Sequence, residues 1–155
     1  MRGSHELKKN YPELMEMFQE ALTLRRAIAP ESGLVASALN SLAAVENLQG
    51  DTAAAERDFR EALRIAKKIN HREGVAIYTG NLAELMLDRK DWPGAETLAR
   101  ESLEFAEEVR RQDLIGTACC YLAKALARQG KAAGGLPYAR RVYFFRNANS
   151  GELAV

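Results

Sequence analysis

The sequence predicts an all-α protein built from a stack of antiparallel helix pairs. Similar segments recur at a fixed interval, namely SLAAVENLQGD at 41–51, NLAELMLDRKD at 81–91 and YLAKALARQGK at 121–131. Apolar and small residues within them are spaced by three and four, which is the period of one helix face. Each segment ends in the same turn column, occupied by Gly50-Asp51, Lys90-Asp91 and Gly130-Lys131. A fixed period of this kind indicates a repeat architecture in which each helix pair packs on the next.

The first elements precede the repeats. Residues 1–10 are expected to be a leader and the remnant of a first helix, because MRGSH resembles the leader of an expression vector. Residues 11–29 are expected to be a half-repeat that supplies only a second helix. Its Phe18 aligns with Phe59 in the second helix of the next repeat. Pro30 then ends this helix, and Ser32 can cap the next one.

Three repeats follow, at 30–70, 71–110 and 111–150. In repeat 1, Gly50 can take the left-handed conformation that ends a helix, and Asp51 can cap the second helix. In repeat 2, Pro93 falls in the first turn of the second helix, where a missing N–H costs nothing. The small residues Ala43, Ala55 and Ala62 are expected where two helices approach closely.

The end of the array departs from this pattern. Gly134, Gly135 and Pro137 weaken the first turns of the last helix, which is therefore expected to begin near Leu136. The stretch VYFF at 142–145 is apolar on every side and should be covered. Residues 151–155 align with the start of a further first helix. The chain is thus expected either to be a fragment of a longer array or to pack this end on a second copy.

The repeated columns resemble the tetratricopeptide repeat. The residues that match the spacing of that family are Leu42-Ala43, Gly50-Asp51, Ala55, Phe59 and Ala62-Leu63. The period exceeds the family's usual value of about 34 residues. It is similar to the long-helix variant of kinesin light chains, Pins-type scaffolds and bacterial signalling sensors. The resemblance implies a right-handed α-solenoid whose first helices line a concave groove for protein partners.

Composition excludes several other classes of protein. The formal net charge is +1, and basic and acidic residues are interleaved, so neither nucleic acid nor an anionic membrane is an expected partner. The apolar runs are too short to cross a bilayer. The two cysteines, Cys119 and Cys120, are adjacent, which favours reduced thiols and a cytoplasmic protein.

We find no arrangement typical of an enzyme. His5 lies in the leader and His71 in a polar connector, so neither has a ligand-spaced companion. Cys119 is expected to be buried as a small apolar residue, although a redox pair with Cys120 is the alternative. The glycine-rich GKAAGG at 130–135 lacks the order of a phosphate-binding loop. The sequence therefore predicts no catalytic residues, no metal and no cofactor.

By the family resemblance, the groove is lined by Asn40, Ser41, Asn47, Ile77, Asn81, Glu84, Asp88, Tyr121, Lys124 and Arg128, with Leu87, Thr117 and Cys120 beside them. The amide of Asn81 offers a donor and an acceptor to a peptide main chain, or else it bonds its neighbours. We expect Glu84–Lys124 and Asp88–Arg128 to form salt bridges between repeats, with ligand recognition as the alternative.

Two functions remain open. The first is a protein-interaction module that binds a peptide or helix of an unidentified partner in the groove, as part of a larger regulatory or scaffold protein. The second is a module that forms a homodimer through the apolar array end, at Tyr143, Phe144 and Phe145.

Overall fold

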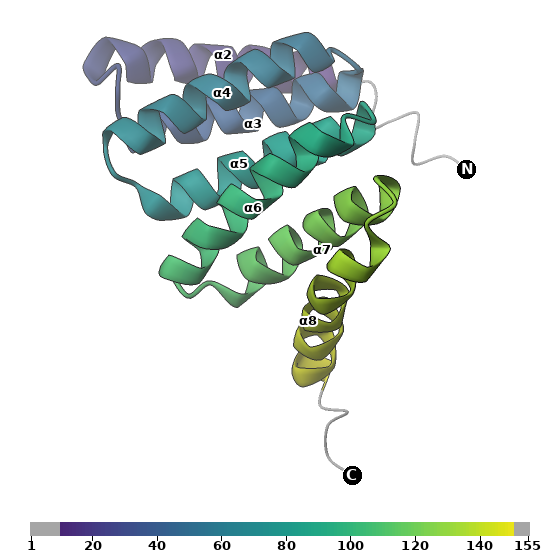
Figure 1. The fold of residues 1–155 in the computed structure, drawn as a ribbon. Helices are drawn as coiled ribbons and strands as arrows, with labels where there is room; N and C mark the ends of the chain where they lie inside the picture. Colours follow the sequence, from purple (N-terminus) through teal and green to yellow (C-terminus); the bar gives the residue numbers. More distant parts are fainter. Residues whose placement is uncertain (1–9, 151–155) are drawn as a thin grey trace. The chain divides into compact units, whose positions relative to one another are not determined.

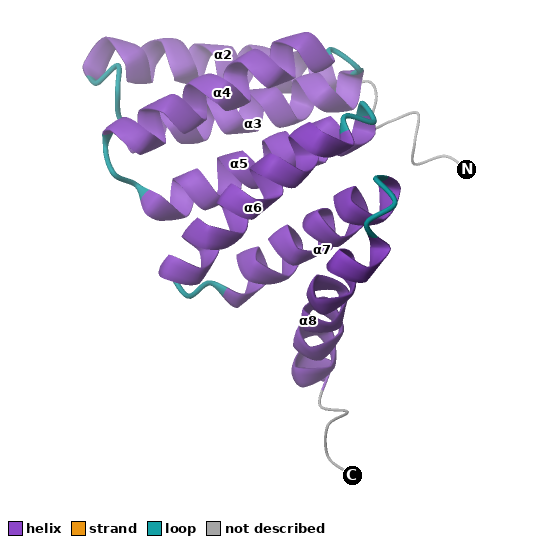
Figure 2. Cartoon of the chain, in the orientation of Figure 1, coloured by secondary structure: helices purple, strands orange, loops and turns teal. Residues whose placement is uncertain are grey.

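The computed structural model describes residues 10–150 and the side chains up to residue 147. This part of the chain contains no strand (Figures 1 and 2). Its seven helices are α2 (Tyr11–Ile28), α3 (Gly33–Gln49), α4 (Thr52–Lys68), α5 (Arg72–Asp88), α6 (Trp92–Glu108), α7 (Gln112–Arg128) and α8 (Ala132–Ser150). None of them is long and apolar enough to span a membrane. The expected leader and the expected further helix lie outside the described residues.

The turns that follow α3 to α7 share one backbone device, repeated at even intervals along the chain. Each contains a residue with positive φ: Gly50 (89°), Asn70 (54°), Lys90 (62°), Arg110 (55°) and Gly130 (75°). The next residue donates its N–H to a carbonyl five positions back, as Asp51 does to Glu46 at 2.9 Å. This Schellman motif satisfies the last carbonyls of a helix. The predicted left-handed Gly50 is confirmed.

Side-chain caps start three of the helices. Ser32 accepts the N–H of Val35 at 3.3 Å, and Asp51 accepts that of Ala54 at 3.0 Å. Asp91 does the same for Gly94 at 3.0 Å, and Pro93 lies in the first turn of α6. The predicted caps at Ser32 and Asp51 and the predicted place of Pro93 are therefore confirmed. Each such cap stabilises its helix by about 1 kcal/mol.

The chain divides into two compact units, up to Gly74 and from Val75 onward. In the first unit α3 packs against both α2 and α4 (Figure 1). Ala43, Ala55 and Ala62 have no exposed surface, as the prediction of close helix approach requires. The same unit buries two carboxyl groups, those of Glu46 on α3 and Asp58 on α4. Burying an ionisable group without full pairing opposes folding.

The second unit has its core between α5, α6, α7 and α8. Leu103 of α6 and Cys119 and Leu122 of α7 belong to this core. Small side chains such as Ala76 and Ala99 belong to the same core and allow the helices to approach closely. At this short separation, the hydroxyl of Ser102 donates a hydrogen bond to the carbonyl of Ala76 at 2.8 Å. This buried bond ties α6 to α5.

The last helix begins earlier than the sequence predicts. α8 starts at Ala132, not near Leu136, and Pro137 lies inside it. The first turn forms because the N–H groups of Gly134 and Gly135 both reach the carbonyl of Lys131, at 3.0 and 3.2 Å. N–H groups in a first turn need no helical partner, so two glycines there cost less than in a helix interior.

Gly135 also permits close packing of α8 on α7. A Cβ atom at this position would lie 3.2 Å from the carbonyl oxygen of Ala123, which is backbone and cannot rotate away. The glycine that weakens the helix locally therefore allows the two helices to touch.

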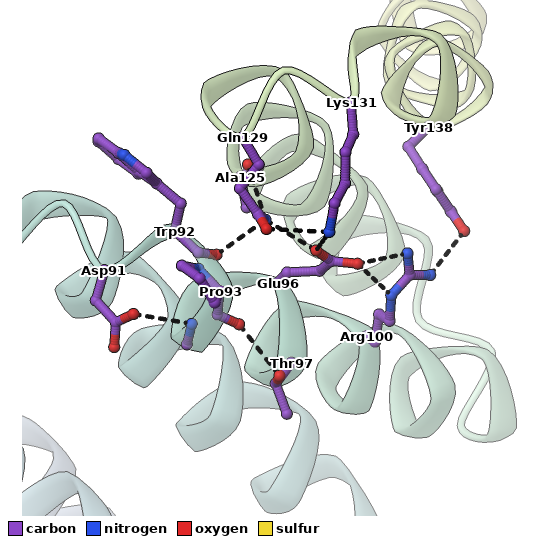
Figure 3. A network of polar contacts seen from close by, with 11 residues as sticks. Asp91, Trp92, Pro93, Glu96, Thr97, Arg100, Ala125, Gln129, Lys131 and Tyr138 are labelled. Carbon is purple, nitrogen blue, oxygen red and sulfur yellow. Dashed lines mark hydrogen bonds and ion pairs between the residues drawn. The ribbon is translucent and has the colours of Figure 1, made fainter.

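A polar network fixes α6 to the turn between α7 and α8 (Figure 3). The carboxylate of Glu96 accepts bonds from Arg100 and Gln129, each at 2.8 Å, and from Lys131 at 3.2 Å. Arg100 also donates to the hydroxyl of Tyr138 at 3.3 Å. The bond from Arg100, then those from Gln129 and Lys131, lowers the pKa of Glu96 to about 2.

Candidate functional site

A pocket of about 320 Å³ lies between α5 and α7 in the second unit. It is lined by Glu84, Leu87 and Asp88 of α5, Trp92 of α6, and Tyr121, Lys124 and Arg128 of α7. We call this the α5–α7 pocket. The lining residues of α5, and likewise those of α7, are three, four or seven positions apart, so the residues from each helix lie on one face of it. Sequence reasoning assigned all of these residues except Trp92 to the groove.

Tyr121 forms one wall of the pocket. Its ring is half-buried, and its hydroxyl lies close enough to the carboxylate of Glu84 for the two groups to interact across the two helices. Burial raises the pKa of Tyr121 well above its usual range, and the negative charge of Glu84 raises it further. The phenol is therefore neutral at physiological pH. A ring held in this way offers a rigid apolar face and a polar edge.

Trp92 and Arg128 form the opposite side. The guanidinium carbon of Arg128 lies 5.7 Å from the centroid of the Trp92 ring, within the range of a cation–π contact. The tryptophan stands at the first position of the second helix, where the other repeats have Thr52 and Ala132. A large side chain at a position that is otherwise small could have indicated the site from the sequence. Because tryptophan is largely apolar, it indicated core packing instead.

The charges of the pocket are not paired as the sequence predicted. Among the described residues, no ion pair joins Glu84 to Lys124 or Asp88 to Arg128; Glu84 lies close to the Tyr121 hydroxyl, and Arg128 stacks on Trp92. The prediction of these two salt bridges is therefore wrong. All four charged side chains are exposed. The pocket therefore presents carboxylates from α5 and cations from α7.

The other predicted groove residues do not line this pocket. Ile77 and Asn81 are half-buried on α5, about two turns and one turn before Glu84, respectively. Asn40, Ser41 and Asn47 are half-buried on α3 in the first unit, where Ser41 donates to the carbonyl of Ser37 at 3.1 Å.

Thr117 and Cys120 line a separate cavity of about 520 Å³ between α7 and α8. Cys119 is buried and Cys120 half-buried, and both are free thiols. Burial raises the pKa of the Cys119 thiol, which disfavours the reactive thiolate. Within residues 10–150, no three potential ligand side chains are grouped to hold a metal ion.

The apolar end of α8 is partly covered. Val142 and Phe145 pack against the core of the second unit, whereas the side chains of Tyr143 and Phe144 are 62% and 60% exposed. The expectation that VYFF lacks cover within this chain is therefore corrected for Val142 and Phe145. Tyr143 and Phe144 meet edge to face, with ring centroids 6.2 Å apart.

Comparisons with known proteins agree with this architecture. The sequence matches the tetratricopeptide repeat over residues 3–68 and again over residues 75–110. Among solved structures, it is similar in fold to BtubC (BKLC) from P. vanneervenii, with a TM-score of 0.82 and 20% identity. That alignment covers 92% of this chain and 59% of the solved chain. No curated protein matches the sequence.

The fold is an all-α solenoid, as predicted. Tetratricopeptide repeats mediate protein–protein interactions, and such solenoids are typically scaffolds without catalytic activity. With helix pairs repeating at a fixed interval and both sequence matches pointing to one repeat type, this chain belongs to the tetratricopeptide repeat family.

Proposed function

We propose that the α5–α7 pocket binds a peptide or helix of a partner protein. The observation that carries this proposal is the arrangement of four exposed charges, with Glu84 and Asp88 on α5 and Lys124 and Arg128 on α7. Opposite charges that do not neutralise one another can orient a partner segment whose own charges alternate. Tyr121 supplies the rigid contact surface at the centre.

The main-chain amide clasp predicted for Asn81 extends the same proposal. Asn81 lies on α5, three residues before Glu84, so both point to neighbouring parts of one helix face. A side-chain amide can accept a peptide N–H and donate to a peptide C=O without reading sequence. In this proposal the amide holds the main chain, while the charged pocket selects the side chains. We place the module in a regulatory or scaffold assembly in the cytoplasm.

Selection of binding peptides from a random displayed library would test the proposal. The affinity of each selected peptide is then measured by fluorescence anisotropy for the unaltered chain and for Tyr121→Ala, Arg128→Ala and Asn81→Ala. We expect Tyr121→Ala and Arg128→Ala to weaken binding about tenfold or more, as truncation of central aromatic and arginine contacts does. Glu104→Ala, on the exposed face of α6, is the control and should leave the affinity unchanged. Peptides that bind all variants equally would contradict the proposal.

A second candidate function is self-association through α8. The exposed, adjacent rings of Tyr143 and Phe144 support it, since contiguous exposed aromatic surface is typical of interfaces. Sedimentation over a range of concentrations should show a dimer that the variant with Tyr143→Ser and Phe144→Glu abolishes. Phe145 is left unchanged because it packs against the core. A chain that remains monomeric at all concentrations would end this candidate.

A further inference from the structure

The first unit contains a cavity of about 680 Å³ that the proposed function does not use. Leu22 of α2 and Leu39 and Leu42 of α3, all buried, form part of its lining. Arginines stand around these leucines, with Arg26 on α2 and Arg57, Arg60 and Arg64 on α4. The cavity therefore combines apolar lining with a cationic rim, within a single compact unit.

The repeat itself shows why this cavity is open. Asp58 occupies the column that holds Leu98 and Tyr138 in the later repeats. In the second unit α6, α7 and α8 correspond to α2, α3 and α4. There Tyr138 packs against the core and its hydroxyl accepts a bond from Arg100 at 3.3 Å (Figure 3). Asp58 is much smaller than tyrosine, and its carboxylate is held by Nε of Arg57 at 2.8 Å.

Three of the four arginines on the rim have acidic partners, since Arg57 pairs with Asp58, Arg60 with Glu56, and Arg64 with Glu61 and Glu31. The lining includes four arginines but two acids, Asp58 and Glu61. Asp58 is held by Arg57, and Glu61 is held by both nitrogens of the Arg64 fork at 2.8 Å. The bond from Arg64 lowers the pKa of Glu61, and the positive charge of Arg26 lowers it further.

Two arginines retain donors for a ligand. Arg60 contacts Glu56 through Nε and Nη2, and among the described residues its Nη1 has no ion-pair partner. Arg26 likewise forms no ion pair within residues 10–150. Guanidinium groups of this kind favour carboxylate or other planar anions.

We propose that this cavity binds an acidic segment of a partner protein that carries one aromatic side chain. The aromatic ring takes the place that Tyr138 fills in the second unit, against Leu22, Leu39 and Leu42. The flanking carboxylates of the partner lie against Arg26 and Arg60. This second contact face is independent of the α5–α7 pocket, so the chain can hold two partner segments, one on each unit.

NMR titration of the ¹⁵N-labelled chain with three acetylated, amidated pentapeptides tests the proposal. The probe is Asp-Glu-Phe-Glu-Asp, and the comparison peptides are Asn-Gln-Phe-Gln-Asn and Asp-Glu-Ala-Glu-Asp. We expect saturable shifts in α2, α3 and α4 with the probe, and at least about tenfold weaker binding of both comparison peptides. Raising the salt concentration should weaken the probe's binding, because the contacts are charged and partly exposed.

Matched variants identify the residues. Replacing both Arg26→Gln and Arg60→Gln should weaken binding of the probe about tenfold or more. Arg140→Gln is the control, because Arg140 occupies the column of Arg60 in the second unit and is exposed. Asp58→Leu, which restores the side chain found at Leu98, should fill the cavity and remove binding. Tyr121→Ala should have no effect.

Three results would overturn the proposal. One is an absence of shifts in α2, α3 and α4 with the acidic aromatic probe. Another is equal binding of the neutral peptide, which would show that the arginines do not contribute. The third is an equal effect of Arg140→Gln and of the Arg26/Arg60 pair, which would indicate unspecific attraction. Because Arg26 and Arg60 are exposed, their replacement tests binding even if Asp58→Leu fails to fold.

Discussion

The buried carboxyl of Glu46 should make the first unit more stable in mild acid than at neutral pH. Glu46 is only 5% exposed, and its Oε2 has no hydrogen-bond partner among the described residues. Its Oε1 lies 3.8 Å from Nη2 of Arg57, too far for a strong ion pair. Burial, and then the negative charge of Asp58, raises the pKa of Glu46 to about 7, against the opposing charge of Arg57.

The size of the effect follows from that shift. The ordinary pKa is 4.5 and the folded value about 7, which at about 1.4 kcal/mol per unit corresponds to roughly 3 kcal/mol. Because the pKa of Glu46 is higher in the folded than in the unfolded chain, protonation of this carboxyl favours the folded state. This stabilisation is fully present below the unfolded pKa of 4.5 and is lost as pH rises through about 7. The unaltered chain should therefore lose roughly 3 kcal/mol of folding free energy across this window.

Glu46→Gln removes the titration and keeps the shape. We expect this variant to lack the loss between pH 4.5 and 7. Near pH 8 it should be more stable than the unaltered chain by about 2 kcal/mol, since an imperfectly bonded amide still costs about 1 kcal/mol. Urea unfolding followed by circular dichroism at several pH values measures the difference. Hydrogen exchange in α3 and α4 reports the first unit separately.

The control is Glu104→Gln, which removes an exposed carboxylate from α6. It should leave the shape of the stability-versus-pH curve unchanged. If Glu46→Gln and the unaltered chain give parallel curves, the carboxyl is solvated in solution and the reasoning is refuted.

Four other substitutions test the packing and the turns. Glu96→Gln weakens the network in Figure 3. Because the pKa of Glu96 is lowered to about 2, its ionised carboxylate stabilises the fold above about pH 4.5, and this stabilisation is lost as pH falls through 2. At pH 7 urea unfolding should show a loss of about 1 kcal/mol, since the network is partly solvated. Gly50→Ala should cost about 1 kcal/mol, whereas Lys90→Gly, at the equivalent positive φ, should cost nothing or stabilise. Gly80→Ala places a Cβ atom 3.1 Å from Oγ of Ser102 and should lower the melting temperature by several degrees.

Periodicity predicted the turns beyond what residue type alone could. Gly50 and Gly130 are usual at positive φ, but Lys90 and Arg110 are not, and nothing in their chemistry favours that conformation. They adopt it in turns closed by hydrogen bonds from the next residue, in which Asp91 donates its N–H to the carbonyl of Met86 at 2.9 Å and Arg111 donates to that of Ala106 at 3.2 Å. The hydrogen bonds that end each helix therefore override the local preference at these two positions.

The candidate site was predictable in position but not in its contacts. The offset between repeats places Tyr121 and Lys124 beside Glu84. It cannot decide which side chain each charge meets, because that depends on rotamers and on neighbours outside the column. Trp92 is such a neighbour. The guanidinium of Arg128, for which the sequence predicted a salt bridge with Asp88, stacks on the Trp92 ring.

The same reasoning applies to the start of α8. Glycine and proline were expected to delay the helix to Leu136, since both lower helix propensity. The observed start at Ala132 follows from the turn before it, where the carbonyl of Lys131 accepts two N–H groups. The close approach of Gly135 to Ala123 adds packing that no propensity scale contains.

The differences between equivalent positions therefore bear more on function than the repeat itself. Equivalent positions with the same residue in every repeat, such as Leu42, Leu82 and Leu122, are buried each time and help to fix how the helices pack. A column that changes, such as Asp58 against Tyr138, leaves the backbone in place but opens or fills the space between helices. Since both kinds of position share one scaffold, exchanging a divergent residue for its equivalent alters a binding surface at little cost to the fold. Asp58→Leu is informative for this reason, because it introduces the side chain that the chain already carries at the equivalent position, Leu98.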